Sequence, residues 1–289
     1  MTGLLAVEAG DLDRTVTVSK TAADTGEASA NLQAGDQLKL RDLLTAALLP
    51  SANDASVAIA EALSGSVPAF VQRMNARAAE LGLRDTRFGN PDGLPSPGHI
   101  SSARDLATIA REALQHEEFR STVCLEKAKL TYARRGTKGP QTREVLSTNR
   151  LLRHEHPEHW DLADGVKTGY TKAAGRCLCA SATEGGWQLL AVVLGCTDCW
   201  ADGRKLLSWG FAQYRRERIV TADATTARVH IVGGKRPTVR AVAKSSLDLI
   251  VPIGESPAAA RVSETYPEAP VSAGDEVGEL IVCRIDGTQ

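Results

Sequence analysis

The sequence lacks a dominant charge and any long apolar run. Lys and Arg total 34 and Asp and Glu total 35, which gives a net charge of −1 with both signs interspersed. The chain therefore has no basic field that would attract nucleic acid or a membrane surface. No apolar stretch reaches the ~18–20 residues of a transmembrane helix. The first residues, "MTGLLAVEAGDLD", lack the basic leader and the cleavage site of a signal peptide.

Several chemical signatures are missing as well. There is no Gly-x-Ser-x-Gly elbow, no glycine-rich phosphate loop, no internal repeat and no low-complexity tract. Cys196 and Cys199 form a single C-x-x-C, which falls short of the ligand set of a structural zinc site, so we expect the cysteines to be free thiols. The histidine-rich stretch 153–160 contains Pro157, which prevents the helix of a His-Glu-x-x-His site. We therefore expect no metal site.

The first part of the chain is patterned for helices. Apolar residues recur at spacings of three and four through most of residues 1–115, and "SSARDLATIAREAL" opens with a serine cap. Residues 15–19 alternate like a short strand, and 89–99 is turn chemistry that predicts a surface loop. These patterns predict a mainly helical first third.

The pattern changes near residue 127. "AKLTYA" is strand-like, "RRGTKGPQTRE" reads as a polar excursion, and two apolar strands are joined by the Glu-Gly-Gly turn at 184–186. A helix over about 201–214 follows, and beyond it only short valine-rich runs such as "ARVHIV", "LDLIVPI" and "GELIVCRI" occur. We expect an α/β domain over 1–215, with helices on both faces of a mainly antiparallel sheet, and a small all-β domain over 216–289.

The stretch "SANDAS", residues 51–56, lies between two predicted helices. Pro50 ends the first helix, and Asn53 is well placed to cap the second, which is the common role of Asn at such a position. The alternative is that Ser51 and Asn53 both face a cleft, one as a hydroxyl relay and the other as an amide donor. The short motif by itself does not decide between these interpretations.

A second motif, Lys167-Thr168-Gly169, opens a strand in "DGVKTGYT". Its ordinary interpretation is a strand edge with a solvated lysine. The glycine adds a physical argument, because a strand without a Cβ at that position lets a substrate backbone lie against it. The two motifs together, with helices around the first and a hairpin beginning at the second, are more specific than either alone.

In these two motifs and the text around them, the sequence resembles the serine-type D-alanyl-D-alanine carboxypeptidases, the low-molecular-mass penicillin-binding proteins. The resemblance is carried by "ALLPSANDAS", "NPDGLPSPGHISSARDLA", "STNRLL" and "DGVKTGYTKAAGRCL" and runs nearly end to end. These acyl enzymes carry Ser-x-x-Lys, Ser-Asp-Asn and Lys-Thr-Gly signatures, and this chain has variants of the last two. The resemblance implies a fold of the penicillin-binding-protein and β-lactamase type.

The first signature is absent, because no Ser-x-x-Lys occurs anywhere in the 289 residues. In the family the nucleophile lies in text resembling "SxTKIMTALLALE", which "MTGLLAVE" matches from its internal Met onward. We therefore expect that Ser-x-x-Lys lies immediately upstream of Met1, that the chain is truncated there, and that it is inactive as given. The family also commonly continues past the C-terminus with an amphipathic membrane-binding helix.

The resemblance implies hydrolysis of the D-Ala-D-Ala end of peptidoglycan stem peptides through an acyl-serine, with β-lactams as inhibitors and no cofactor. Ser51 would pass a proton to the leaving amine together with Lys167, and Asn53 would hydrogen-bond the substrate amide. Lys167 and Thr168 would bind the terminal carboxylate. The N–H of Tyr170 would supply one arm of the oxyanion hole, beside the open face of Gly169.

Other interpretations remain open. One is a non-catalytic protein that binds cell-wall peptides and keeps the cleft without the chemistry. Another is a β-lactamase relative, which requires a deacylating glutamate, although Glu118 and Glu144 do not lie in a recognisable loop of that kind. Arg150, in "STNRLL", is either a ligand for the substrate carboxylate or a surface charge. The family also implies a location on the cell-wall side of the cytoplasmic membrane.

Overall fold

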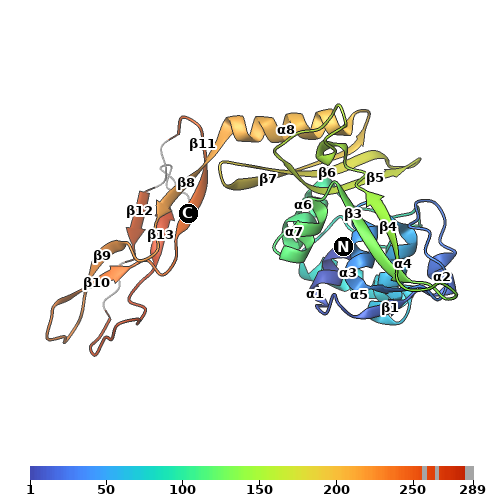
Figure 1. Ribbon diagram of the computed structural model, residues 1–289. Helices are drawn as coiled ribbons and strands as arrows, with labels where there is room; N and C mark the ends of the chain where they lie inside the picture. The colour runs from blue at the N-terminus through green and yellow to red at the C-terminus, as the bar shows by residue number, and fades with distance from the viewer. Residues whose placement is uncertain (256–258, 264–266, 284–289) are drawn as a thin grey trace. The chain divides into compact units, whose positions relative to one another are not determined.

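The computed structural model describes residues 1–255, 259–263 and 267–283 (Figure 1). The chain divides into two compact units, Met1–Ser208 and Trp209–Gln289. The first unit holds both sequence motifs, and its architecture decides how they meet.

Most helices of the first unit come from the part of the chain where the sequence predicts them. Fully buried Leu4, Leu44, Ile59 and Phe70, from separate helices, share one apolar core. Ser102 caps the helix that follows it, since its side chain accepts a hydrogen bond from the N–H of Asp105, as predicted. The helices are α1 (Thr2–Glu8), α2 (Lys20–Ala23), α3 (Leu40–Leu48), α4 (Asn53–Ser64), α5 (Val67–Glu80), α6 (Ala103–Ala113) and α7 (Glu117–Val123).

A four-stranded antiparallel sheet lies beside these helices in the order β1 (Thr15–Thr17), β2 (Gln37–Lys39), β3 (Lys127–Ala133) and β4 (Gln141–Leu146). The interpretation of "RRGTKGPQTRE" as a polar excursion is wrong for its second half, which is strand β4. This strand lies at the edge of the sheet, so several of its polar side chains face solvent and its sequence does not show a fully apolar pattern.

A three-stranded antiparallel sheet carries the second motif. Its order is β5 (Ala163–Thr171), β6 (Gly175–Glu184) and β7 (Trp187–Cys196), and the predicted turn at 184–186 joins the last two strands. Lys167 on β5 is opposite Cys179 on β6.

Helices cover both faces of this sheet, as expected. A Cβ at Gly165 would lie 2.8 Å from the Oγ of Ser181 and 3.2 Å from Val123 of α7, so α7 packs on one face. A Cβ at Gly203 in α8 (Cys199–Gln213) would lie 3.1 Å from Leu178, so the start of α8 packs closely on the other face. Successive side chains of a strand point to opposite faces, which lets β6 contact both layers.

The second unit is built of short antiparallel pairs. Strand β8 (Tyr214–Val220) pairs with β11 (Leu247–Pro252), β9 (Thr225–His230) with β10 (Thr238–Val242), and β12 (Ala259–Val262) with β13 (Leu280–Cys283). The predicted run "GELIVCRI" ends at 285, and residues 284 and 285 lie outside the described part of the chain. The domain boundary expected at 215 stays a prediction.

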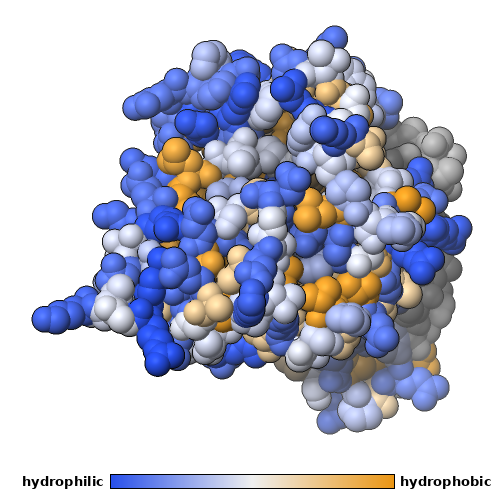
Figure 2. All heavy atoms as spheres, turned by 90° about the vertical axis from the view of Figure 1, so that its right-hand side faces the viewer, coloured by the Kyte–Doolittle hydropathy of each residue, from blue (hydrophilic) through white to orange (hydrophobic). Residues whose placement is uncertain are grey.

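Among the described residues, no helix is both long enough and apolar enough to cross a bilayer. On the face shown in Figure 2, hydrophobic side chains gather in several patches separated by polar and charged ones.

Candidate active site

The two motifs meet in the first unit. The Nζ of Lys167 donates hydrogen bonds of 2.8 Å to the Oγ of Ser51 and 2.8 Å to the carbonyl oxygen of Thr168. Ser51 follows α3 and adopts a left-handed backbone conformation with φ of 62°, which is uncommon for a residue with a side chain. The turn brings the hydroxyl of Ser51 to a lysine that lies 116 positions further along the chain.

Lys167 has a perturbed pKa. Burial of its ammonium group disfavours the charged form and lowers the pKa from 10.5 to about 8. The lysine is therefore still mainly protonated at neutral pH and can bind an anion. It also gives up a proton more readily than a solvent-exposed lysine, which suits a group that moves protons between a hydroxyl and a leaving amine.

Asn53 lies in the same cleft, and the interpretation of Asn53 as a helix cap is wrong. Ala52 occupies the N-cap position of α4, and Asn53 is the first helical residue. Its Nδ2 instead donates a 3.0 Å hydrogen bond to the carbonyl oxygen of Gly26, and its backbone N–H donates to Ala28. These two bonds fix the amide side chain, which is only 5% exposed, at the wall of the cleft.

Asp54, which the sequence does not single out, holds the neighbouring loop. Its carboxylate is fully buried and accepts hydrogen bonds from the N–H groups of Ala30 and Leu32 and from the hydroxyl of Ser29. The carboxylate also lies in the first turn of α4, where the helix dipole favours a negative charge. The loop that supplies the acceptor for Asn53 is therefore ordered by the residue next to it.

The remaining members of the second motif lie along β5. The hydroxyls of Thr168 and Thr148 share a 2.5 Å hydrogen bond, and the N–H of Thr148 donates to the carbonyl oxygen of Leu49. Thr148 thus joins the "STNRLL" segment to the turn that carries Ser51. A Cβ at Gly169 would meet only Cys177, at 3.9 Å, so space is open beside it. The side chain of Tyr170 is 69% exposed.

The six predicted site residues therefore lie together, although Asn53 does not cap a helix. Ser51, Asn53, Lys167, Thr168, Gly169 and Tyr170 line a single cavity of about 800 Å³. This volume lies within the ~300–1,000 Å³ of typical small-molecule sites. A protonated lysine, two hydroxyls and an amide line this cavity. These groups can bind a carboxylate and transfer a proton.

Arg150 lines the same cavity from its rim. It begins a 3₁₀ helix, Arg150–Leu152, and its guanidinium lies 4.3 Å from the ring centroid of Trp200. Its Nη1 is 3.7 Å from a carboxylate oxygen of Glu158. Both contacts hold the side chain at the cavity.

The expectation of free thiols is wrong for two cysteines, because Cys196 and Cys199 form a disulfide. The physical reason is the short connection between β7 and α8, which brings the two Cα atoms to 5.4 Å. Cys177 and Cys179 are free, and burial raises the pKa of the Cys179 thiol to about 12. No group of three or more His, Cys, Asp or Glu side chains among the described residues could hold a metal ion.

Comparison with known proteins gives the same answer as the geometry. Residues 1–198 match the family model for D-alanyl-D-alanine carboxypeptidase, peptidase S11. The chain is 34% identical to D-alanyl-D-alanine carboxypeptidase DacF of Bacillus subtilis over 98% of its own length and 73% of that protein. It is 32% identical to DacC of Escherichia coli over 92% of its length and 66% of that protein.

A solved structure agrees over nearly the whole chain. Penicillin binding protein 5 of Haemophilus influenzae superposes with a TM-score of 0.74 at 27% identity, covering 98% of this chain and 84% of that one. The match supports the antiparallel α/β architecture derived from the sequence. The chain belongs to the D-alanyl-D-alanine carboxypeptidase family, the peptidase S11 family of low-molecular-mass penicillin-binding proteins.

Proposed function

We propose that the cleft binds the D-Ala-D-Ala end of peptidoglycan stem peptides, and the β-lactams that mimic it. The observation that carries this proposal is the 2.8 Å contact between Lys167 and Ser51 in a cavity of substrate size. Lys167 and Thr168 bind the terminal carboxylate, and the charge-assisted bond from the lysine supplies most of the attraction. In this proposal the protein acts on the cell-wall side of the cytoplasmic membrane, where such peptides occur.

The other side chains have roles around the scissile bond in this proposal. Ser51 relays a proton to the leaving amine, with Lys167 as its hydrogen-bond partner. Asn53 bonds the substrate amide through its side chain, and the N–H of Tyr170 is one arm of the oxyanion hole. The open space beside Gly169 accommodates the substrate backbone.

The covalent step of the family needs a serine activated as a nucleophile. The Ser-x-x-Lys signature is absent from the 289 residues, and its expected place upstream of Met1 stays a prediction. We therefore propose that the chain as given recognises the peptide without forming the acyl-serine. The same cleft together with an in-frame Ser-x-x-Lys segment would act as a carboxypeptidase.

A binding titration tests recognition. Diacetyl-L-Lys-D-Ala-D-Ala should bind the chain, and the D-Ala-L-Ala isomer should bind at least tenfold more weakly. Lys167→Met should abolish the binding of the first peptide, because it removes the cation that meets the carboxylate. Exposed Lys20→Met is the matched control and should leave the affinity unchanged. Equal affinity for both isomers, or normal binding by the Lys167 variant, would refute the proposal.

A further inference from the structure

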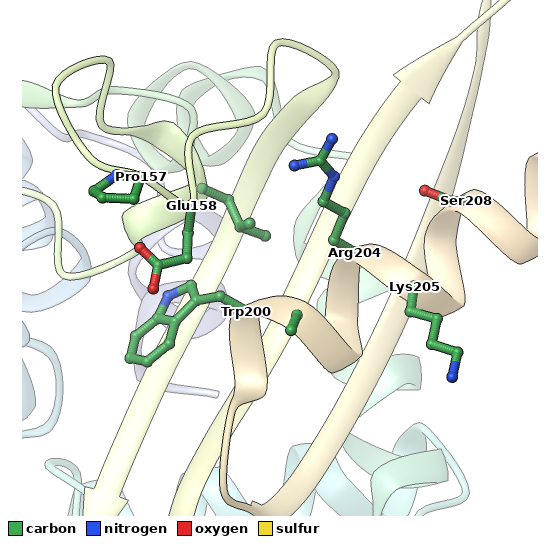
Figure 3. Close-up of a pocket in the computed structure, with 8 residues that line it drawn as sticks. Pro157, Glu158, Trp200, Arg204, Lys205 and Ser208 are labelled. Carbon is green, nitrogen blue, oxygen red and sulfur yellow. The ribbon is translucent and has the colours of Figure 1, made fainter.

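A second pocket lies beside the cleft (Figure 3). Its volume is about 390 Å³, and its walls are the 3₁₀ helix Arg150–Leu152, the loop that follows, and the first turns of α8. Leu151, Trp200 and Ala201 give it an apolar surface, and Glu158, Arg204 and Ser208 give it a polar one. Trp200, Arg204 and Ser208 are spaced by four residues and so share one face of α8.

The lining of this pocket includes one carboxylate, Glu158, and two cations, Arg204 and Lys205. Glu158 lies 3.7 Å from Arg150 and also contacts the ring of His156. Arg204 and Lys205 line the pocket and form no ion pair with any acid of the described residues. A guanidinium without an ion pair next to an apolar surface favours an organic anion over a neutral ligand.

The side chains differ in how they face this space. In Figure 3, Arg204 and Ser208 point to the same side of α8, and the carboxylate of Glu158 lies beside the indole of Trp200, whereas Lys205 points away from them. The guanidinium of Arg204 lies 5.6 Å from the ring centroid of Trp160. Stacking of this kind uses the flat face of a guanidinium and leaves its in-plane N–H groups available to an anion.

The pocket and the cleft share one lining residue. Trp200 lines both, and Arg150, which lines the cleft, stacks on Trp200 at 4.3 Å. A peptide extends by ~3.3–3.6 Å per residue, so a chain whose last carboxylate is at Lys167 and Thr168 can place earlier residues past Trp200. A peptide that runs from the cation of the cleft past Trp200 leads toward the guanidinium of Arg204.

We propose that Arg204 and Ser208 bind a second carboxylate of the stem peptide, upstream of its D-Ala-D-Ala end. This inference rests on the proposed function, since it assumes that the peptide terminus lies in the cleft. The pocket then selects the substrate by charge. It favours stem peptides in which an internal α-carboxylate is free over those in which the same group is amidated.

The test compares two peptides that differ by one group. Acetyl-L-Ala-γ-D-Glu-L-Lys-D-Ala-D-Ala carries a free α-carboxylate on D-Glu, and its D-isoglutamine counterpart carries a carboxamide. The acid should bind the chain about fivefold more tightly than the amide at low salt, as expected for a solvent-accessible charge pair, and raising the salt should reduce the ratio. Arg204→Gln should bring the ratio to one without changing the affinity for the amide.

Arg84→Gln, an exposed arginine outside both pockets, is the matched control and should keep the ratio. Equal affinity of the wild-type chain for the two peptides would overturn the proposal, as would an unchanged ratio in Arg204→Gln. Diacetyl-L-Lys-D-Ala-D-Ala, which lacks the second carboxylate, separates the two claims. If it binds while the longer peptides show no preference, only the pocket proposal fails. If none of the three peptides binds, the proposed function fails as well.

Discussion

At the scale of the residue, Lys167 connects stability with pH. Its pKa is about 8 in the folded chain, because burial disfavours the charged form, against 10.5 for an ordinary lysine. Below pH 8 both the folded and the unfolded chain hold the proton, and the folded chain carries the full cost of burying the charge. Between pH 8 and 10.5 the unfolded chain binds more protons, so this lysine makes the free energy of unfolding rise with pH.

This sign gives a prediction for Lys167→Met. The variant has no buried charge, so its advantage in unfolding free energy over the wild type should shrink as the pH is raised from 7 to 10. Urea denaturation of both proteins at each pH measures the difference. Curves that run parallel across the whole pH range would show that the lysine has its ordinary pKa in the folded state.

The residues also show how far the sequence could predict the site. The convergence of Ser51, Asn53 and Lys167 was expected from the family resemblance that the two short motifs carry. The prediction that the second motif opens a strand is wrong, since Lys167 lies in the middle of β5. The Asp-Gly pair near the beginning of this strand is typical of a turn, and it hides the strand's start from the sequence pattern. Asp54 and Thr148 could not be found in this way. Their partners are backbone groups of segments distant in the sequence, such as the N–H of Leu32 and the carbonyl of Leu49, and no local pattern marks such a bond.

At the scale of the element, the disulfide between Cys196 and Cys199 fastens the end of β7 to the start of α8. A C-x-x-C alone is compatible with free thiols, a metal or a disulfide, and only the close approach of the two elements decides it. Strand β4 was missed for a similar reason, since its polar edge residues pair with β3 through the backbone. Strand pairing defines β4, and the approach of β7 to α8 defines the disulfide; the side-chain pattern shows neither.

The disulfide should stabilise the first unit. A disulfide that closes so short a loop lowers the entropy of the unfolded chain, which stabilises the folded state by about 2 kcal/mol. Reduction with a phosphine, or the double change Cys196→Ala and Cys199→Ala, should lower the free energy of unfolding by about that amount. The reductant should have no further effect on the double variant. The exposed free thiol Cys124 provides the control, since Cys124→Ala should leave stability unchanged. If the reductant left the free energy of unfolding of the wild-type chain unchanged, this role would be contradicted.

At the scale of the whole molecule, the fold class was predictable because helical periodicity fills the first third and apolar strands follow it. The family is shown by similarity along nearly the full chain, and the chain spans 73% of the length of DacF and 66% of the length of DacC. In the proposed function the cleft recognises the peptide, while the nucleophile signature of the family does not occur in these 289 residues. We propose that this chain recognises the peptide without being acylated.

Intact-mass spectrometry after incubation with benzylpenicillin tests that claim most directly. Under native conditions the chain should appear as a complex with the antibiotic, and after denaturation it should return to its unmodified mass, because nothing has attacked the β-lactam ring. A chain carrying an in-frame Ser-x-x-Lys segment should instead retain a covalent adduct after denaturation. An adduct on the 289-residue chain would contradict the account and make Ser51, 2.8 Å from Lys167, the first nucleophile to examine. The absence of any native complex would contradict recognition itself.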